Sequence, residues 1–133
     1  MNALRQEIRF ARAPDGARLA FATLEGTGYP LVRAPFWFSH IERDGQCALT
    51  RPWLDALGTR YRFVRYDPRG CGLSDHRLDD CSLDAMVADL EAVADAARLE
   101  RFALLGGCQG GPIALRYAAR HPDRVSHLVL IGA

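Results

Sequence analysis

The chain has 133 residues, of which 49% are hydrophobic and 25% charged, and its formal net charge is +1. This is the size of one domain, so residues 1–133 are expected to form a single domain. A net charge so close to zero gives no electrostatic reason to expect nucleic-acid binding, because such binding needs a clustered basic surface. No apolar run approaches the roughly 18 residues that span a bilayer, and the first ten residues lack the apolar region of a secretory signal. We therefore expect a cytoplasmic protein with neither membrane nor nucleic acid among its partners.

The cysteines and histidines do not have the spacing of a metal site. Cys47, Cys71, Cys81 and Cys108 are scattered without a CxxC pair, and the histidines do not supply the missing ligand pairs. A structural zinc site needs two close pairs of ligands. In a chain without an export signal, thiols are expected to stay reduced. The sequence thus predicts no metal, no cofactor and free cysteines.

The first third of the chain predicts a hairpin and a third strand. Apolar and polar residues alternate over 6–12, and a returning strand over 18–23 follows a Pro-Asp-Gly turn. A shorter strand is expected over 31–36. No clear period follows over 37–50, and a short helix is expected over 52–57, with a proline in its first turn.

The remainder alternates strands and helices. Ser82 is the expected N-cap of a helix over 83–97, because apolar residues recur there every 3.6 positions. The other expected elements are a strand over 62–67, a strand over 101–106, a helix over 112–120 and a strand over 125–133. Hairpin strands followed by this alternation predict an α/β sheet whose later strands are parallel and joined by right-handed crossovers.

The strand over 101–106 runs directly into a helix through the sequence Gly-Gly-Cys-Gln-Gly. This is the small-x-nucleophile-x-small pattern of a nucleophile elbow. Such a turn is so sharp that Gly106 and Gly110 must be small, and it pushes the side chain of Cys108 out above the sheet edge. The helix N-terminus beneath it favours negative charge, and the backbone N–H of Gln109 would point at a substrate oxyanion. Cys108 is therefore the candidate nucleophile.

Two alternatives for this turn remain. A phosphate-binding loop would need Gly-Lys-Ser/Thr, or else Gly-x-Gly-x-x-Gly after the first strand and an acidic residue about 20 positions later. Neither pattern is present. The second alternative is a structural turn with a buried cysteine.

Three segments together resemble the N-terminal part of the α/β-hydrolase fold superfamily. They are the Asp15-Gly16 hairpin, the sequence YDPRGCGLSD at 66–75 and the sequence LLGGCQGG at 104–111. The resemblance covers about residues 6–133 and implies that the chain holds strands one to six of the family sheet, truncated after the sixth strand. The surrounding sequence also resembles bacterial domains of this fold that are fused to LuxR-type regulators or nucleotide cyclases.

The family's nucleophile position falls on Cys108, where most members have serine. The family's oxyanion loop carries His-Gly after the third strand, whereas this chain has Ala-Pro-Phe-Trp at 34–37. Pro35 has no N–H to donate, so the second oxyanion donor would be a backbone N–H near Trp37. The aromatic residues at 36–38 belong either to the core or to the apolar wall of an acyl pocket.

The family's acid and histidine follow the nucleophile in the chain, and no such pair follows Cys108 here. We expect His121 to lie at the edge of the sheet away from the elbow and His127 to be a core or surface histidine within its strand. This leaves His40 as the candidate substitute base. Asp67 and Arg69 are expected to brace the active-site rim through hydrogen bonds.

The resemblance implies an ester or acyl hydrolase that takes a small ester-like substrate and is weakly active or inactive as residues 1–133 alone. A non-catalytic sensing or interaction domain of a regulatory protein is one alternative, and a non-functional fragment is another. The strand at 126–132 would be an exposed apolar edge, which favours self-association or pairing with a C-terminal segment.

Overall fold

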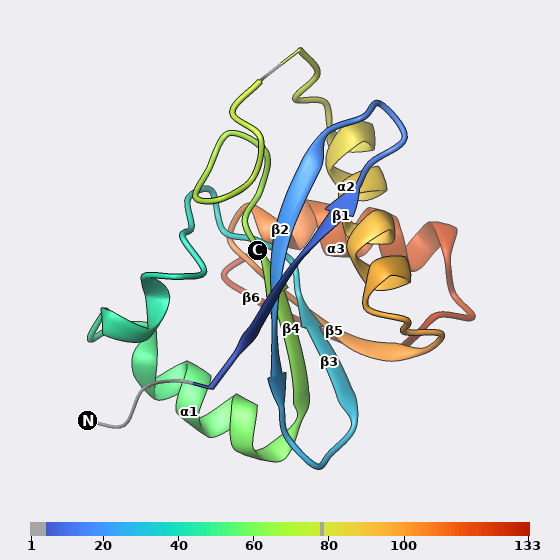
Figure 1. Ribbon diagram of the computed structural model, residues 1–133. Coiled ribbons are helices and arrows are strands. Elements are labelled where there is room, and N and C mark those ends of the chain that lie inside the picture. Colours follow the sequence, from blue (N-terminus) through green and yellow to red (C-terminus); the bar gives the residue numbers. More distant parts are fainter. Residues whose placement is uncertain (1–4, 78) are drawn as a thin grey trace.

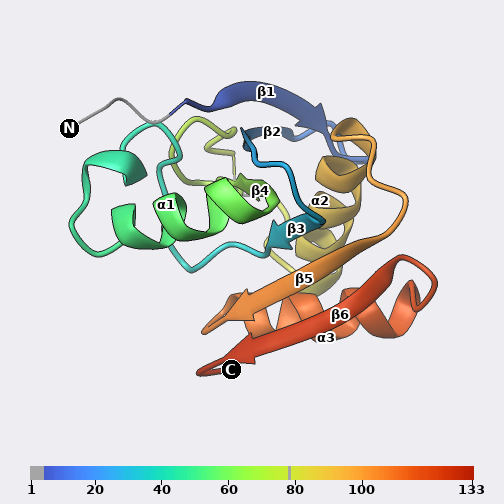
Figure 2. The ribbon, with the colours of Figure 1, turned by 90° about the horizontal axis from the view of Figure 1, so that it is seen from below.

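The computed structural model describes residues 5–77 and 79–133, and these form one six-stranded sheet with helices on both faces (Figure 1, Figure 2). The strands are β1 (Glu7–Arg12), β2 (Arg18–Glu25), β3 (Pro30–Arg33), β4 (Arg62–Tyr66), β5 (Phe102–Gly107) and β6 (Val125–Ile131). The helices are α1 (Arg51–Arg60), α2 (Leu83–Ala96) and α3 (Gly110–Arg120), with a 3-10 turn η1 (Asp44–Gln46). Within these ranges, no helix is long and apolar enough to cross a membrane.

The strand order β1-β2-β4-β3-β5-β6 confirms the predicted α/β fold. β1, β2 and β4 pair antiparallel, while β4, β3, β5 and β6 are mutually parallel. The carboxyl ends of these four parallel strands therefore meet at one edge of the sheet. Cys108 directly follows β5 at this edge.

Two elements differ from their predicted bounds by three residues at one end, more than any other element. β3 ends at Arg33 rather than at residue 36, because Pro35 has no N–H with which to continue the ladder. α1 continues through Gly58 to Arg60, beyond the expected end at residue 57. A Cβ on Gly58 would lie 2.6 Å from Leu24 Cδ1, so this glycine lets the helix pack closely on β2 instead of ending it.

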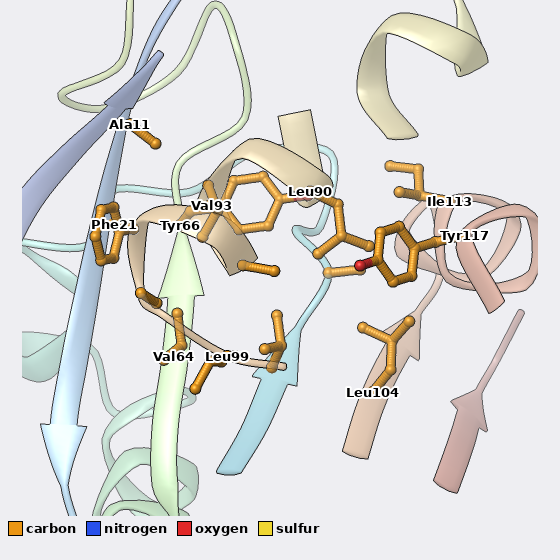
Figure 3. Packing of buried hydrophobic residues seen from close by; sticks show 14 of the residues in the cluster. Ala11, Phe21, Val64, Tyr66, Leu90, Val93, Leu99, Leu104, Ile113 and Tyr117 are labelled. Carbon is orange, nitrogen blue, oxygen red and sulfur yellow. The ribbon is translucent and has the colours of Figure 1, made fainter. Parts of the chain in front are cut away.

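The larger part of the core lies between the sheet and helices α2 and α3 (Figure 3). The apolar stripe of α2, which includes Leu90 and Val93, packs there with Val64 of β4 and Tyr117 of α3. Ser82 caps α2 as predicted, because its hydroxyl accepts a hydrogen bond from the backbone N–H of Ala85 at 3.1 Å.

Helix α1 covers the opposite face of the sheet (Figure 2). Its buried Leu54 packs against Leu24, Leu31 and Phe63. β6 is the outermost strand on its side of the described sheet, and its residues Leu128 to Ile131 are 37–47% exposed.

The loops at the carboxyl edge are held by the buried carboxylate of Asp67, which follows β4. It accepts hydrogen bonds from Ser39 Oγ at 2.6 Å and from the backbone N–H groups of Ile41 and Leu73, each at 2.9 Å. The segment after β3 and the loop after β4 are thereby fixed to each other. The predicted bracing role of Asp67 is confirmed.

Arg69 links the same loop to helix α2 and to the hairpin turn between β1 and β2. Its guanidinium contacts both carboxylate oxygens of Asp89 in α2, at 2.6 and 2.8 Å, and Asp15 in the hairpin turn at 2.8 Å. The Arg69 and Asp89 side chains are both 3% exposed. The bracing role of Arg69 is confirmed as well.

Replacing Asp89 by asparagine leaves the Arg69 charge buried with only Asp15 as an anionic partner. We expect Asp89→Asn to lower the free energy of unfolding by about 3 kcal/mol, at the lower end for a broken buried pair. Urea denaturation measures this loss. Asp79→Asn is the matched control, because the Arg77–Asp79 pair is 84% and 78% exposed and should leave the midpoint unchanged. Equal midpoints for the two variants would contradict the bracing role.

Candidate active site

Cys108 lies in a sharp turn between β5 and α3 and has a positive φ of 48°. Its backbone N–H donates to the Ile131 carbonyl at 3.1 Å, and its own carbonyl accepts from the Gly111 N–H at 3.0 Å. Non-glycine residues rarely adopt this left-handed conformation, because Cβ crowds the backbone there. The side chain is exposed rather than buried.

The turn requires glycine two positions before and two positions after Cys108. A Cβ on Gly106 would lie 2.7 Å from Ala114 Cβ in α3, and one on Gly110 would lie 2.9 Å from the Pro35 carbonyl oxygen. The steric reason that the motif gives for small residues at both positions therefore holds in the structure. The loop after β3 is part of this close contact.

Cys108 lines two cavities. We call the first the α1 cavity; it has a volume of about 280 Å³ and is walled by Trp53 and Leu57 of α1 together with Leu105 and Ile131. The second, the loop cavity, has a volume of about 450 Å³ and is walled mainly by the segment that follows β3. Arg33, Phe36 and Thr50 line both cavities.

The aromatic residues after β3 line the loop cavity, which favours a pocket wall over a core position for them. Trp37 and Phe38 are 68% and 63% exposed and contact each other edge to face, with ring centroids 4.7 Å apart. The Trp37 carbonyl accepts a weak hydrogen bond from Cys71 Sγ at 3.8 Å.

The two backbone groups predicted to bind an oxyanion have no acceptor among the described residues. In the part of the chain that the structure describes, neither the N–H of Gln109 nor that of Trp37 donates to another protein group. Gln109 occupies the N-cap position of α3, directly after Cys108. The Gln109 side chain instead turns toward Met86, with its Nε2 3.9 Å from the sulfur.

The structure brings one histidine to the cavities around Cys108. His40 lines the loop cavity, and its Nδ1 is buried without a hydrogen-bond partner among the described residues. His121 and His127 lie near the start of β5, at the opposite edge. His121 Nε2 is 3.7 Å from Glu91, and His127 stacks edge to face on Tyr29.

The cysteines and acidic residues show no arrangement for a metal. Over residues 5–77 and 79–133, no group of three or more His, Cys, Asp or Glu side chains could hold an ion. Cys47, Cys71, Cys81 and Cys108 are all free of disulfide bonds.

Sequence reasoning missed a buried charged cluster in the cavity wall. Arg33 and Arg65 are register partners on β3 and β4, and both approach Oδ2 of Asp44, at 3.7 and 3.5 Å. Burial, and secondarily the charge of Arg65, lowers the pKa of Arg33 to about 10. The only sign of this cluster in the sequence is Arg33, an arginine at the end of an otherwise apolar strand.

Comparisons with known proteins agree with this architecture. Residues 43–133 match the family model described as "alpha/beta hydrolase fold". The chain belongs to the α/β-hydrolase fold family, which confirms the resemblance drawn from the motifs.

The relatives include several kinds of hydrolase. A protein named carbamate hydrolase RutD, from Rhizobium rhizogenes, is 37% identical over 83 residues, which are 62% of this chain and 32% of that protein. The structure of an N-formylmaleamic acid deformylase from Pseudomonas putida S16 has a TM-score of 0.75 and 33% identity, covering 93% of this chain and 46% of that one. The esterase RhEst1 from Rhodococcus sp. ECU1013 has a TM-score of 0.81 and 29% identity, covering 95% and 46%. The chain thus spans less than half the length of these relatives.

The positive φ at residue 108 predicts that the elbow costs stability. We expect Cys108→Gly to have a free energy of unfolding about 1 kcal/mol higher than Cys108→Ala, since glycine adopts this conformation without the Cβ clash. Chemical denaturation of the two variants measures the difference.

The same pair of substitutions at Cys81 is the control, because Cys81 has no positive φ. There glycine should be the less stable of the two variants, through its greater entropy when unfolded. An equal or lower stability of Cys108→Gly relative to Cys108→Ala would contradict the strained turn.

Proposed function

We propose that Cys108 is the nucleophile of an ester or related acyl hydrolase. The observation that carries this proposal is an exposed cysteine with φ of 48° at a glycine-flanked strand-to-helix turn, bordering two cavities. A strained residue retained between packed elements is typical of a functional position. In this family the elbow is the position of the nucleophile.

The chemistry follows from the groups around the thiol. The Cys108 sulfur, as thiolate, attacks the carbonyl carbon of the substrate and forms a tetrahedral oxyanion. The N–H groups of Gln109 and Trp37 would stabilise that oxyanion. Collapse breaks the bond to the alcohol, which leaves with a proton, and water then hydrolyses the thioester to release the acid and restore the thiol.

The proton transfers need a base and a group that orients it. We propose that the acid and histidine of a triad lie outside residues 1–133, since relatives of this fold are more than twice as long as the matched segment. His40, with its buried, unpartnered Nδ1 in the loop cavity, is the substitute base within the chain. Residues 1–133 are then an incomplete domain in which Cys108 is acylated but turnover is weak or absent.

The outer strand β6 supports the same proposal. Leu128, Val129, Leu130 and Ile131 are 37–47% exposed at the end of the described sheet. An apolar edge of this kind pairs readily with another strand. We propose that β6 pairs with a C-terminal segment. Where that segment is absent, β6 would pair with a second copy of the chain.

The substrate class is proposed from the relatives' names. A carbamate hydrolase, a deformylase and an esterase each act, by name, on an acyl carbon bonded to oxygen or nitrogen. The mostly apolar walls around Cys108 suit a small molecule. We therefore propose a small ester-like substrate and no cofactor, in a cytoplasmic protein.

One observation favours a second candidate function. Ala34 and Pro35 follow β3, where the family carries His-Gly, and Pro35 cannot donate a hydrogen bond. Together with the resemblance to domains fused to LuxR-type regulators or nucleotide cyclases, this supports a non-catalytic sensing domain that binds a small molecule in the same cavities.

A chromogenic ester separates the two functions. We expect residues 1–133 mixed with p-nitrophenyl acetate to release a burst approaching about one equivalent of p-nitrophenolate per chain, because acylation of Cys108 outpaces thioester hydrolysis. Stopped-flow absorbance measures the burst.

Cys108→Ala should abolish this fast phase, and Cys81→Ala, which removes another exposed thiol, should keep it. A burst of the same size and rate in wild type and Cys108→Ala would overturn the nucleophile. Absence of any burst in the wild type would favour the sensing domain.

A further inference from the structure

The wall shared by the two cavities contains a buried cation with unfilled hydrogen-bonding capacity. Arg33 is only 5% exposed, and its Nε is buried without a partner. In the described part of the chain the Arg33 guanidinium donates no hydrogen bond at all. Its contact with Asp44 Oδ2, at 3.7 Å, exceeds hydrogen-bond distance. Burying a charged donor without acceptors is costly, so this state calls for an explanation.

The neighbouring charges do not fill that capacity. Arg65 approaches the same Asp44 oxygen at 3.5 Å, so one carboxylate is shared between two guanidiniums. Arg65 also donates to Gln6 Oε1 and the Ile41 carbonyl, which gives it a structural role. Asp67 is the other nearby anion, and both of its oxygens are already occupied by loop donors. Arg33 is the member of the cluster that lines both cavities.

An aromatic ring fixes Arg33 close to the elbow. Its Cζ lies 5.0 Å from the centroid of the Phe36 ring, and that ring in turn packs against Gly107, where an added Cβ would meet Phe36 Cε1 at 2.7 Å. The Phe36 ring therefore contacts both the guanidinium and the backbone next to Cys108. Stacking on an aromatic face is a common way to hold a guanidinium plane in place.

We propose that Arg33 binds a carboxylate of the substrate whose acyl carbon Cys108 attacks. This inference rests on the proposed function and narrows it to esters whose acyl part carries a second, ionised carboxyl group, such as the half-ester of a short dicarboxylic acid. A guanidinium pairs with a carboxylate through two parallel hydrogen bonds, and such pairs are strongest where water is excluded. The apolar remainder of the α1 cavity then accommodates the hydrocarbon between the two groups.

The Arg33 guanidinium itself offers a positive charge to an anionic ligand. Although burial lowers the pKa of Arg33 to about 10, the side chain stays protonated at neutral pH. The groups that face it are Arg65, Asp44 and Asp67, with Phe36 on the ring side. A bound carboxylate would supply the acceptors that burial has removed.

Alkylation of Cys108 tests this proposal without requiring hydrolysis. Iodoacetate and iodoacetamide are nearly the same size, and both transfer their CH₂ carbon to a thiolate sulfur with loss of iodide, but only iodoacetate carries a carboxylate. The rate of each at Cys108 is followed by peptide mass spectrometry, with Cys81 in the same chain as the reference. We expect the iodoacetate-to-iodoacetamide rate ratio to be about tenfold higher at Cys108 than at Cys81.

Two variants locate the effect. Arg33→Gln should reduce the ratio at Cys108 to that at Cys81. Arg43→Gln, which removes an exposed arginine at the rim of the loop cavity, should leave the ratio unchanged. Succinate should also slow the reaction of wild-type Cys108 with iodoacetamide, whereas neutral succinamide should not; this holds even if Arg33→Gln fails to fold.

Equal ratios at Cys108 and Cys81 in the wild type would overturn the anion site, as would a high ratio that persists in folded Arg33→Gln. These outcomes differ from failure of the proposed hydrolase. A chain with an ester burst but no preference for iodoacetate keeps its nucleophile and loses the anion site. A chain with the preference but no burst keeps the anion site as that of a binding domain.

Discussion

The close contact between β5, α3 and the backbone after β3 is the constraint on which the rest of the site depends. Without side chains at Gly106 and Gly110, the strand turns into the helix within a few residues and meets the carbonyls of Ala34 and Pro35. Cys108 is left at φ 48° with its thiol exposed. The same contact holds the segment that leads to Trp37 beside the turn that carries Cys108 and Gln109.

The two faces of the sheet differ in what they bury. The face under α2 and α3 is an apolar core, anchored at its rim by the Arg69–Asp89 pair. The face under α1 carries buried charges at the carboxyl edge, where Arg33, Arg65 and Asp44 lie beside the cavities. A buried ion pair by itself contributes little net stability, which is consistent with the ligand-binding role proposed above for Arg33.

The local features and the α/β sheet could be predicted from the sequence, whereas particular contacts between distant side chains could not. The hairpin, the Ser82 cap and the glycine-flanked turn each depend on a few neighbouring residues. The extension of α1 through Gly58 depends on Leu24, and the environment of Arg33 depends on Phe36, Asp44 and Arg65. The family follows from motifs and is confirmed by comparison, whereas the roles of Cys108, Gln109, Trp37 and His40 remain predictions, because they concern reactivity.

The central claim is that the elbow makes Cys108 chemically different from the other cysteines. Brief exposure of the chain to an activated acetyl ester, followed by peptide mapping at acidic pH to preserve thioesters, tests this most directly. The account predicts acetylation at Cys108 well ahead of Cys47, Cys71 and Cys81, none of which forms a disulfide bond. Equal acetylation of the four residues, or preference for another of them, would contradict it.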